Sequence, residues 1–440
     1  MGSYVPHTEA RRREMLAALG LESVDALFAD IPSDVRLQKP VALPYGMSQM
    51  ETARAMEELA ARNTRYATVL RGAGSYDHFI PPIVTRVTGK EEFVTAYTPY
   101  QAELSQGVLQ SIFEYQTLMC ELCGMDVSNA SVYDGATAAA EAAAMCRERG
   151  RSVALVSAGA HPDTIATLRT YGYGANAETR VAPLASGATD AEALADMLTP
   201  DVACRIVQQP NFYGVLEDVK GLFTLAKAAG VKCVLVANPM ALALLPGGRE
   251  VGADVVCGDA QPLGMPMAFG GPSLGFMTAT SALVRRLPGR IVGETVDHDQ
   301  NRAFVLTLQA REQHIRREKA QSNICSNQAH CALTAAAYLT AMGRRGLEQV
   351  AQSCLGKAHY LARRLCEIEG VSLPYGEGFF HEFVTALPVA PETVERALED
   401  AGVLSGLPLD ESRMLWCVTE KAERKTLDRV AGLVREACGR

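Results

Sequence analysis

Residues 252–275, GADVVCGDAQPLGMPMAFGGPSLG, determine the fold class of this chain. Asp254–Cys257 is a short run of mostly β-branched residues, which predicts a buried strand. Gly258 then begins a loop, because the further glycines at 264, 270, 271 and 275 exclude a regular element. In α/β enzymes, a glycine-rich turn after a strand brings the backbone close to a ligand. The stretch therefore predicts an active-site loop.

This loop has no reactive side chain of the expected kind. The sequence contains no lysine between Lys232 and Lys319, so the loop offers no amine that could form a Schiff base. Asp259 and Gln261 are its polar side chains near the strand end. The stretch has the features of an active-site loop but lacks the reactive group.

Length and composition indicate a soluble protein of ordinary type. The chain has 440 residues, of which 48% are hydrophobic and 21% charged, enough for two or three domains. The net charge of -8 argues against nucleic acid or an anionic membrane as the main partner. The first residues, MGSYVPHTEARRREML, lack an apolar signal core, and no later stretch has the length of a membrane span. We expect a cytoplasmic location.

The twelve cysteines do not form a metal-binding pattern. The one Cys-x-x-Cys pair, Cys120 and Cys123, lies in a helical pattern and has no second pair to complete a tetrahedral zinc site. Most other cysteines lie inside apolar runs, where the thiol acts as a small hydrophobic group. We expect core packing and no metal.

The hydrophobic pattern divides the chain into three parts. Residues 1–64 contain three short helical patterns and too little apolar surface for a core, which predicts an arm that wraps another surface. Residues 65–320 form the large α/β domain. Residues 321–440 begin with an apolar helix, about Gln328–Met342, and form a small α+β domain.

Strands and helices alternate through the large domain. The predicted elements, in chain order, are strand Ser152–Ser157, helix Pro162–Tyr171, strand Cys204–Gln208, helix Leu216–Ala229, strand Val231–Ala237 and the strand at Asp254. This alternation predicts a mostly parallel sheet covered on both faces.

Two irregular segments carry most of the candidate site residues. Residues 71–82, RGAGSYDHFIPP, contain His78, which is either a catalytic base or a histidine that only forms hydrogen bonds. Residues 96–107, AYTPYQAELSQG, hold an unusual density of hydrogen-bonding groups for a connection between elements. Those groups are the side chains of Tyr97, Tyr100, Gln101, Glu103 and Gln106.

The motifs GAGSYDH, YTPYQAELSQG and NASVYDGAT, the last at residues 129–137, resemble the glycine dehydrogenase (decarboxylating) family. This family is the P-protein of the glycine cleavage system, and the resemblance is to its alpha subunit. It extends from Tyr4 to the C-terminus. It implies the fold-type I architecture of pyridoxal-phosphate-dependent enzymes, whereas composition and periodicity alone indicate only an α/β enzyme.

The resemblance also implies that this chain has lost its cofactor anchors. Asn238 stands where relatives that bind the cofactor have an aspartate for the pyridine nitrogen, and Gln261 stands where they have the lysine. In such relatives the turn at residues 134–137 holds the phosphate. Here Asp134 would repel phosphate, although Asp134 or Thr137 can cap the following helix, and both possibilities remain open.

The activity is therefore expected only in a complex. The resemblance implies that a beta subunit holds pyridoxal phosphate, that glycine loses carbon dioxide, and that the aminomethyl group passes to the lipoyl arm of H-protein. The expected assembly is alpha2beta2. The candidate pocket residues that this chain contributes are the five named in residues 96–107, together with His78. The alternatives are a degenerate subunit that only stabilises its partner and an enzyme that acts alone without a lysine.

Overall fold

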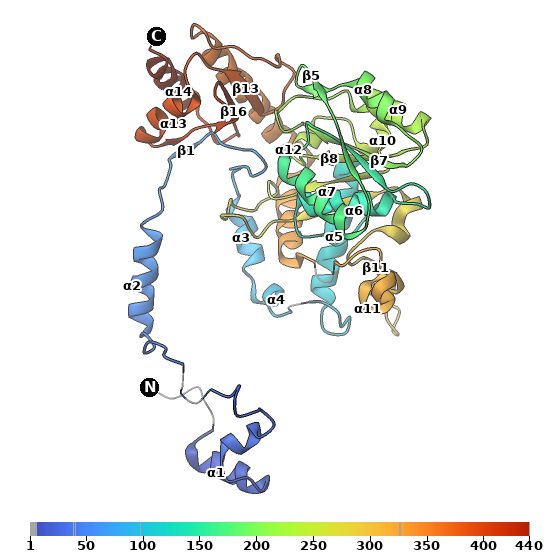
Figure 1. Ribbon diagram of the computed structural model, residues 1–440, viewed down its shortest axis with the longest axis vertical. Coiled ribbons are helices and arrows are strands. Elements are labelled where there is room, and N and C mark those ends of the chain that lie inside the picture. Colours follow the sequence, from blue (N-terminus) through green and yellow to red (C-terminus); the bar gives the residue numbers. More distant parts are fainter. Residues whose placement is uncertain (1–6, 38, 40, 97, 325–326, 440) are drawn as a thin grey trace. The chain divides into compact units, whose positions relative to one another are not determined.

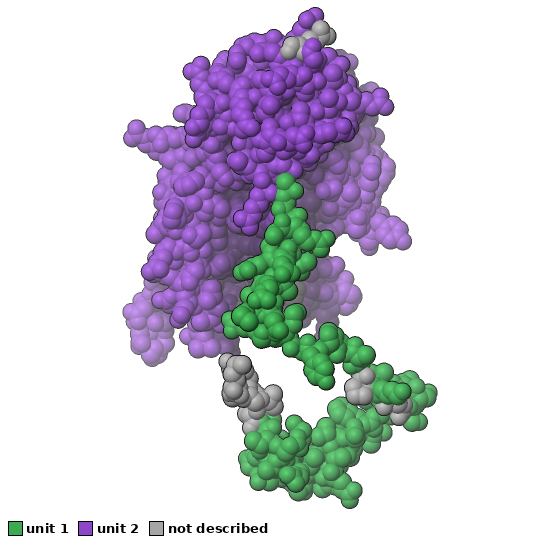
Figure 2. All heavy atoms as spheres, turned by 90° about the vertical axis from the view of Figure 1, so that its left-hand side faces the viewer, with its two compact units in different colours: residues 1–64 green, residues 65–440 purple. Residues whose placement is uncertain are grey.

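The computed structural model describes residues 7–37, 39, 41–96, 98–324 and 327–439. The described chain divides into two compact units, residues 1–64 and residues 65–440 (Figure 2). None of its helices combines the length and the apolar character needed to cross a membrane.

The first unit consists of short helices with little buried surface. Its elements are α1 (Glu9–Ala18), the 3-10 helix η1 (Val24–Phe28) and α2 (Gln49–Ala60). Side-chain oxygens of Thr8 and Ser48 cap α1 and α2, which explains where these helices begin. Among its described apolar residues only Leu16 is buried, while Leu19 and Met50 are 66% and 68% exposed. The described part of this unit has no hydrophobic core of its own.

A seven-stranded sheet forms the centre of the second unit (Figure 1). In spatial order its strands are β2 (Val127–Ser128), β10 (Gly275–Ala279), β9 (Val255–Asp259), β8 (Lys232–Ala237), β7 (Val202–Gln209), β3 (Val153–Ser157) and β4 (Thr179–Ala182). The last five of these are mutually parallel, and β10 runs antiparallel to both of its neighbours. The prediction of a mostly parallel sheet is confirmed.

Alternate residues of the strands point into two separate layers of core. One face packs against α6 (Gly135–Cys146) and α7 (Pro162–Gly174), and its core includes Cys204 and Cys257. The other face packs against α5 (Gln106–Cys123), α9 (Val219–Ala228) and the start of α12 (Ala329–Cys366). Cys123 lies in this second layer, where burial raises the pKa of its thiol to about 12, so it behaves as an apolar group.

The C-terminal residues form a third cluster of buried side chains around Trp416. Its three-stranded antiparallel sheet has the order β13 (Glu382–Ala386), β16 (Arg413–Cys417) and β15 (Leu407–Pro408). Helices α13 (Pro391–Asp400), α14 (Arg424–Ala437) and the second half of α12 supply the remaining core. The short strand β1 (Thr68–Val69) pairs with β14 (Val403–Leu404), so the first residues of the second unit lie against this C-terminal layer.

Further short elements connect these layers. They are α3 (Pro82–Thr88), α4 (Glu91–Val94), β5 (Leu184–Ala185), β6 (Ala188–Thr189), α8 (Ala191–Met197), η2 (Ala241–Ala243), α10 (Gly248–Val251), η3 (Ser281–Arg286), η4 (Gln309–Arg311), α11 (Gln313–Arg316) and η5 (Arg317–Lys319). A hairpin of β11 (Val292–Val296) and β12 (Arg302–Leu306) packs on α5.

Candidate functional site

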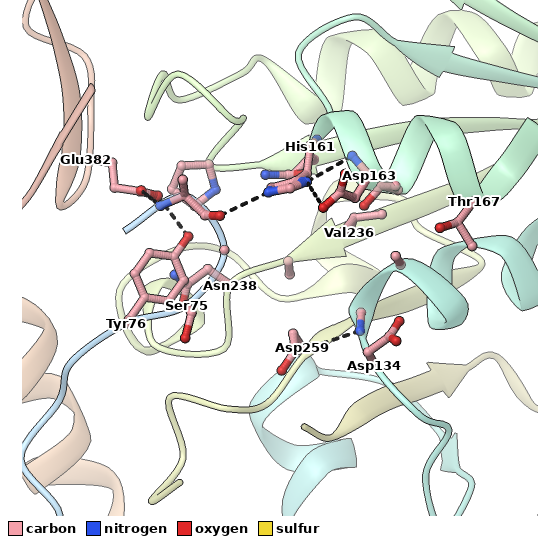
Figure 3. A pocket seen from close by; sticks show the side chains of 18 residues that line it. Ser75, Tyr76, Asp134, His161, Asp163, Thr167, Val236, Asn238, Asp259 and Glu382 are labelled. Carbon is pink, nitrogen blue, oxygen red and sulfur yellow. Dashed lines mark hydrogen bonds and ion pairs between the residues drawn. The ribbon is translucent and has the colours of Figure 1, made fainter. Parts of the chain in front are cut away.

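A cavity of about 420 Å³ lies at the carboxyl ends of β7, β8 and β9 (Figure 3). The first residues of α6 and α7, the segment Ala73–Tyr76 and Glu382 of β13 complete its walls. Ligands of open α/β sheets bind at this end of the strands. Of the stretch predicted to form an active-site loop from Gly258 onward, Asp259 lines this cavity.

Gln261 lies next to Tyr76 of the cavity wall, and both the oxygen and the nitrogen of its amide form hydrogen bonds with backbone groups. Its Oε1 accepts from the Tyr76 N–H at 2.9 Å, and its Nε2 donates to the Tyr76 carbonyl at 3.0 Å and the Met265 carbonyl at 2.7 Å. The residue is only 5% exposed. Gln261, which was expected to stand at the position of the lysine, therefore connects residues 71–82 to the loop after β9 through hydrogen bonds.

Asn238 follows directly after β8 and lines the cavity. Its Oδ1 accepts from the Met240 N–H at 2.9 Å, which fixes the orientation of the amide. Its Nδ2 is shielded from solvent and has no hydrogen-bond partner among the described residues. A protonated pyridine nitrogen is also a donor, so Asn238 in this orientation cannot accept its hydrogen.

Two carboxylates occupy the backbone donors at the start of α6. Asp134 caps the helix, since its Oδ1 accepts from the Thr137 N–H at 2.7 Å. Asp259 Oδ2 accepts from the Gly135 N–H at 3.0 Å, and burial raises the pKa of this carboxyl. The approach is close, because a Cβ on Gly135 would lie 2.9 Å from the Cβ of Asp259. Of the two possibilities for residues 134–137, the geometry supports capping.

Glu382 and His161 hold residues 73–76 from the opposite side. Glu382 accepts from the Ala73 N–H at 2.6 Å and from the Tyr76 hydroxyl at 2.8 Å, and burial raises its pKa to about 7. His161 Nδ1 accepts from the Asp163 N–H, so Nε2 carries the proton and donates to the Ala73 carbonyl at 2.9 Å. The sequence interpretation did not single out either residue, although a lone acid at the start of the apolar strand 382–386 was a usable signal.

The cavity does not fit pyridoxal phosphate. The required amine is absent at position 261, Asn238 cannot accept from a protonated ring nitrogen, and Asp134 and Asp259 already occupy the helix start that would hold phosphate. The described lining contains no lysine or arginine to compensate the phosphate charge. Each of these features opposes the cofactor independently.

His78 does not line the cavity. Its Nδ1 lies 2.7 Å from Glu420 Oε2, and its side chain is 2% exposed. Burial alone raises the pKa of Glu420, but hydrogen bonds with His78 and the Phe79 N–H outweigh burial and hold that pKa at about 2. The structure thus shows His78 in a hydrogen bond with Glu420 and outside the lining of this cavity.

The polar segment at residues 96–107 lies apart from the cavity lining, and its members differ in accessibility. Tyr97 lies outside the described residues. Gln101 and Glu103 are exposed, and Tyr100 is 47% exposed, with the Arg290 guanidinium 4.7 Å from its ring centroid. Gln106 is engaged internally, because its amide pairs with both backbone groups of Phe304 at 2.8 Å. The structure thus presents Tyr100, Gln101 and Glu103 at the surface and uses Gln106 to hold the segment against β12.

The comparisons with known proteins agree with this architecture. The family model described as "Glycine cleavage system P-protein" matches residues 2–434. A protein of Moorella thermoacetica named "Probable glycine dehydrogenase (decarboxylating) subunit 1" is 48% identical over 440 residues, covering 98% of this chain and 99% of the relative. A protein of the same name from Desulforamulus reducens is 45% identical, covering 97% and 98%.

Solved structures show the same relationship. A crystal structure of glycine decarboxylase, the P-protein of the glycine cleavage system, in inhibitor-bound form, matches with a TM-score of 0.92 and 43% identity over 99% of this chain and 100% of that one. The glutamate decarboxylase of Lactobacillus brevis matches with a TM-score of 0.70 at 12% identity over 92% and 96%, which shows the fold alone. The fold is that of the fold-type I pyridoxal-phosphate enzymes. By sequence over nearly its whole length and by fold, the chain belongs to the glycine cleavage system P-protein family.

Proposed function

We propose that this chain is subunit 1 of a two-subunit glycine dehydrogenase (decarboxylating), and that the second subunit holds the pyridoxal phosphate. The proposal rests on the position of Gln261. Its amide makes three hydrogen bonds to backbone where a cofactor lysine would have to stand. Full-length similarity to proteins named as subunit 1 supports the assignment.

The contribution of this chain is made through groups at its surface. The Tyr100 hydroxyl accepts from Arg290 Nη2 at 3.2 Å, which leaves its own hydrogen to donate to a group of the partner or of the substrate. Gln101 and Glu103 are exposed on the same short segment. We assign these three side chains to orienting glycine or the lipoyl arm of H-protein at the contact with subunit 2, in a cytoplasmic alpha2beta2 assembly.

Chemical trapping tests where the cofactor is held. Each subunit and the reconstituted complex are incubated with pyridoxal phosphate, reduced with borohydride and digested for mass spectrometry. We expect a pyridoxyl lysine in subunit 2 and none in residues 252–275 of this chain. Glycine–bicarbonate exchange should require both subunits. A pyridoxyl adduct within residues 252–275, or exchange by this chain alone, would overturn the proposal.

A specific observation favours a second candidate, a subunit that only stabilises its partner. Two of the polar groups expected at the pocket, His78 and Gln106, are engaged within this chain. Tyr100→Phe and Glu103→Gln distinguish the two roles, because each removes one polar function and nearly preserves volume. A lost hydrogen bond that involves a charged group lowers the exchange rate about ten- to a hundredfold.

The matched control for this test is Tyr173→Phe, which removes a hydroxyl from a tyrosine 90% exposed on α7. Sedimentation verifies that each variant complex assembles. Full exchange activity in both test variants, with assembly intact, would identify the subunit as a scaffold. Reduced activity in the test variants but not in Tyr173→Phe supports a role at the pocket.

A further inference from the structure

Three side chains of kinds that bind metals meet at a place outside the cavity. His78 lies between β1 and α3, Cys354 on the second half of α12, and Glu420 between β16 and α14. The His78 Nδ1, the Cys354 Sγ and one Glu420 carboxylate oxygen all lie within 4.8 Å of one another. Among the described residues, this is the one group of three histidine, cysteine and acidic side chains that converges in this way. Positions 78, 354 and 420 share no sequence motif, so the fold alone brings them together.

One carboxylate oxygen contacts both other side chains. Glu420 Oε2 lies 2.7 Å from His78 Nδ1 and 3.4 Å from Cys354 Sγ, so an imidazole hydrogen and a thiol hydrogen both point at it. The other oxygen, Oε1, accepts from the Phe79 N–H at 2.6 Å, and Lys357 Nζ donates to the Glu420 carbonyl. These two bonds fix the orientation of Glu420 from outside the group, as the hydrogen-bond partners of metal ligands do.

The group is buried, and an unpaired hydroxyl lies near it. The side chains of His78 and Glu420 are 2% and 14% exposed, and Cys354 is completely buried. The Tyr338 hydroxyl is shielded from solvent and has no hydrogen-bond partner in the described chain, although most buried polar atoms in proteins have one. Burial raises the pKa of this hydroxyl, and the negative charge of Glu420 raises it further, which shows that the two groups are close.

The ligand atoms indicate the class of metal. Nitrogen, sulfur and oxygen donors together suit zinc, whereas magnesium and calcium bind through oxygen alone. Around a tetrahedral zinc, ligand atoms of these kinds lie about 3.3–3.6 Å from one another. The His78 and Glu420 atoms would separate slightly from their hydrogen-bond distance, while the Cys354 sulfur already lies at a suitable distance from Glu420.

We propose that His78 Nδ1, Cys354 Sγ and Glu420 bind a zinc ion, with a water molecule as the fourth ligand that hydrogen-bonds to the Tyr338 hydroxyl. On binding, zinc replaces the Cys354 thiol hydrogen, which is released to solvent, and the imidazole keeps one hydrogen on Nε2. The two positive charges of the ion then balance the negative charges of the thiolate and the carboxylate, so no net charge is buried. The ion would connect residues 71–82 to α12 and to the segment before α14.

The inference goes beyond the proposed function and is tested by metal binding alone. The full chain, stripped with 1,10-phenanthroline and kept reduced, is titrated with zinc in competition with a chromogenic indicator. A second titration uses cobalt(II), because cobalt bound to a thiolate shows charge-transfer absorption in the near ultraviolet. We expect one tightly bound ion per chain and a thiolate–cobalt band.

Two variants and a control assign the ligands. Cys354→Ala should abolish the cobalt band and weaken zinc more than about a hundredfold, since even the hydrogen-bond partners of metal ligands contribute about ten- to a hundredfold. Glu420→Gln keeps every cysteine and should weaken zinc at least about tenfold, so it carries the test if Cys354→Ala does not fold. Cys204→Ala, which removes a completely buried thiol from the other core layer, is the matched control and should bind both metals like the wild type.

Two results would overturn the proposal. The first is a wild-type chain that binds no zinc or whose cobalt complex lacks the thiolate band. The second is an equal zinc affinity of the wild type, Cys354→Ala and Glu420→Gln, which would mean an adventitious ion only, held by exposed groups such as His298. Circular dichroism verifies that each variant is folded before it is titrated.

Discussion

Replacing Gln261 with lysine should destabilise the chain and should not create a cofactor site. The glutamine amide makes three hydrogen bonds to backbone in a place where the residue is only 5% exposed. A lysine has no acceptor for the Tyr76 N–H, and an unpaired buried donor costs roughly 1–3 kcal/mol. Burial of the ammonium adds to this cost, so we expect a loss of roughly 2–4 kcal/mol in the free energy of unfolding.

Urea titration of the separate subunit measures this loss. Limited proteolysis within residues 71–82 should accelerate in the same variant, because Gln261 holds Tyr76 of that segment. Gln321→Lys, at an exposed glutamine, is the matched control and should change stability by no more than about 0.5 kcal/mol. A Gln261→Lys chain that is as stable as the wild type and retains a pyridoxyl group after borohydride reduction would refute the reasoning.

Three further predictions concern Glu382, Gly135 and residues 1–64. Because burial raises the pKa of Glu382 to about 7 from 4.5, its folded state binds the proton more tightly, so stability should fall as pH rises from about 4.5 to 7. Urea titrations across this pH range should show that Glu382→Gln lacks a pH-dependent component of the free energy of unfolding on the order of 3 kcal/mol. Parallel curves of this free energy against pH for the variant and the wild type would contradict the prediction. Gly135→Ala should cost about 1–3 kcal/mol in a urea titration because its Cβ would lie 2.9 Å from the Asp259 Cβ, whereas Gly107→Ala on α5, with open space around it, should not destabilise. Deletion of residues 1–64 should leave the thermal unfolding midpoint of residues 65–440 within about 2 °C of the wild type by circular dichroism, since the described part of the deleted unit has no core of its own, and a larger fall would show that it stabilises the rest.

The sequence predicted the strands and helix caps that depend on residues close together in the chain. The apolar β-branched runs became the strands, with end shifts of one or two residues such as Val202–Gln209 for the predicted Cys204–Gln208. A cap at Asp134 or Thr137 was one expectation for the start of this alanine-rich helix, and the structure shows that Asp134 is the capping residue. These features depend on neighbours within a few residues.

The helix predicted to end near Met342 does break there, because Gly343 has a φ of 60° and a non-helical conformation. A second helical segment follows up to Cys366 and has its own apolar face in the C-terminal core. The hairpin at residues 292–306 was not predicted, because most of β11 is exposed and lacks the apolar pattern of a buried strand.

The site itself depended on long-range contacts that no pattern reveals. Asp259 reaches Gly135, which is 124 positions away, and Gln261 reaches Tyr76, 185 positions away. The sequence shows that the lysine is missing. It does not show that Gln261, which stands in its place, hydrogen-bonds to the backbone of Tyr76. Within residues 96–107, the sequence also could not show that Gln106 is held inside the chain while other polar side chains are exposed. That difference depends on the hydrogen bond between Gln106 and Phe304.

The pairing of β1 with β14 affects the order in which parts of the protein can fold during synthesis. Thr68 and Val69 find their partners only at Val403 and Leu404, and the neighbouring Ala73 and Tyr76 need Glu382. Synthesis proceeds from the N-terminus, so this segment leaves the ribosome hundreds of residues before the strands that receive it. The central sheet can form during translation, but one wall of the cavity must wait until the chain is nearly finished. A ribosome that stalls before residue 382 would leave a nascent chain with an open cavity and an unpaired strand edge for chaperones to shield.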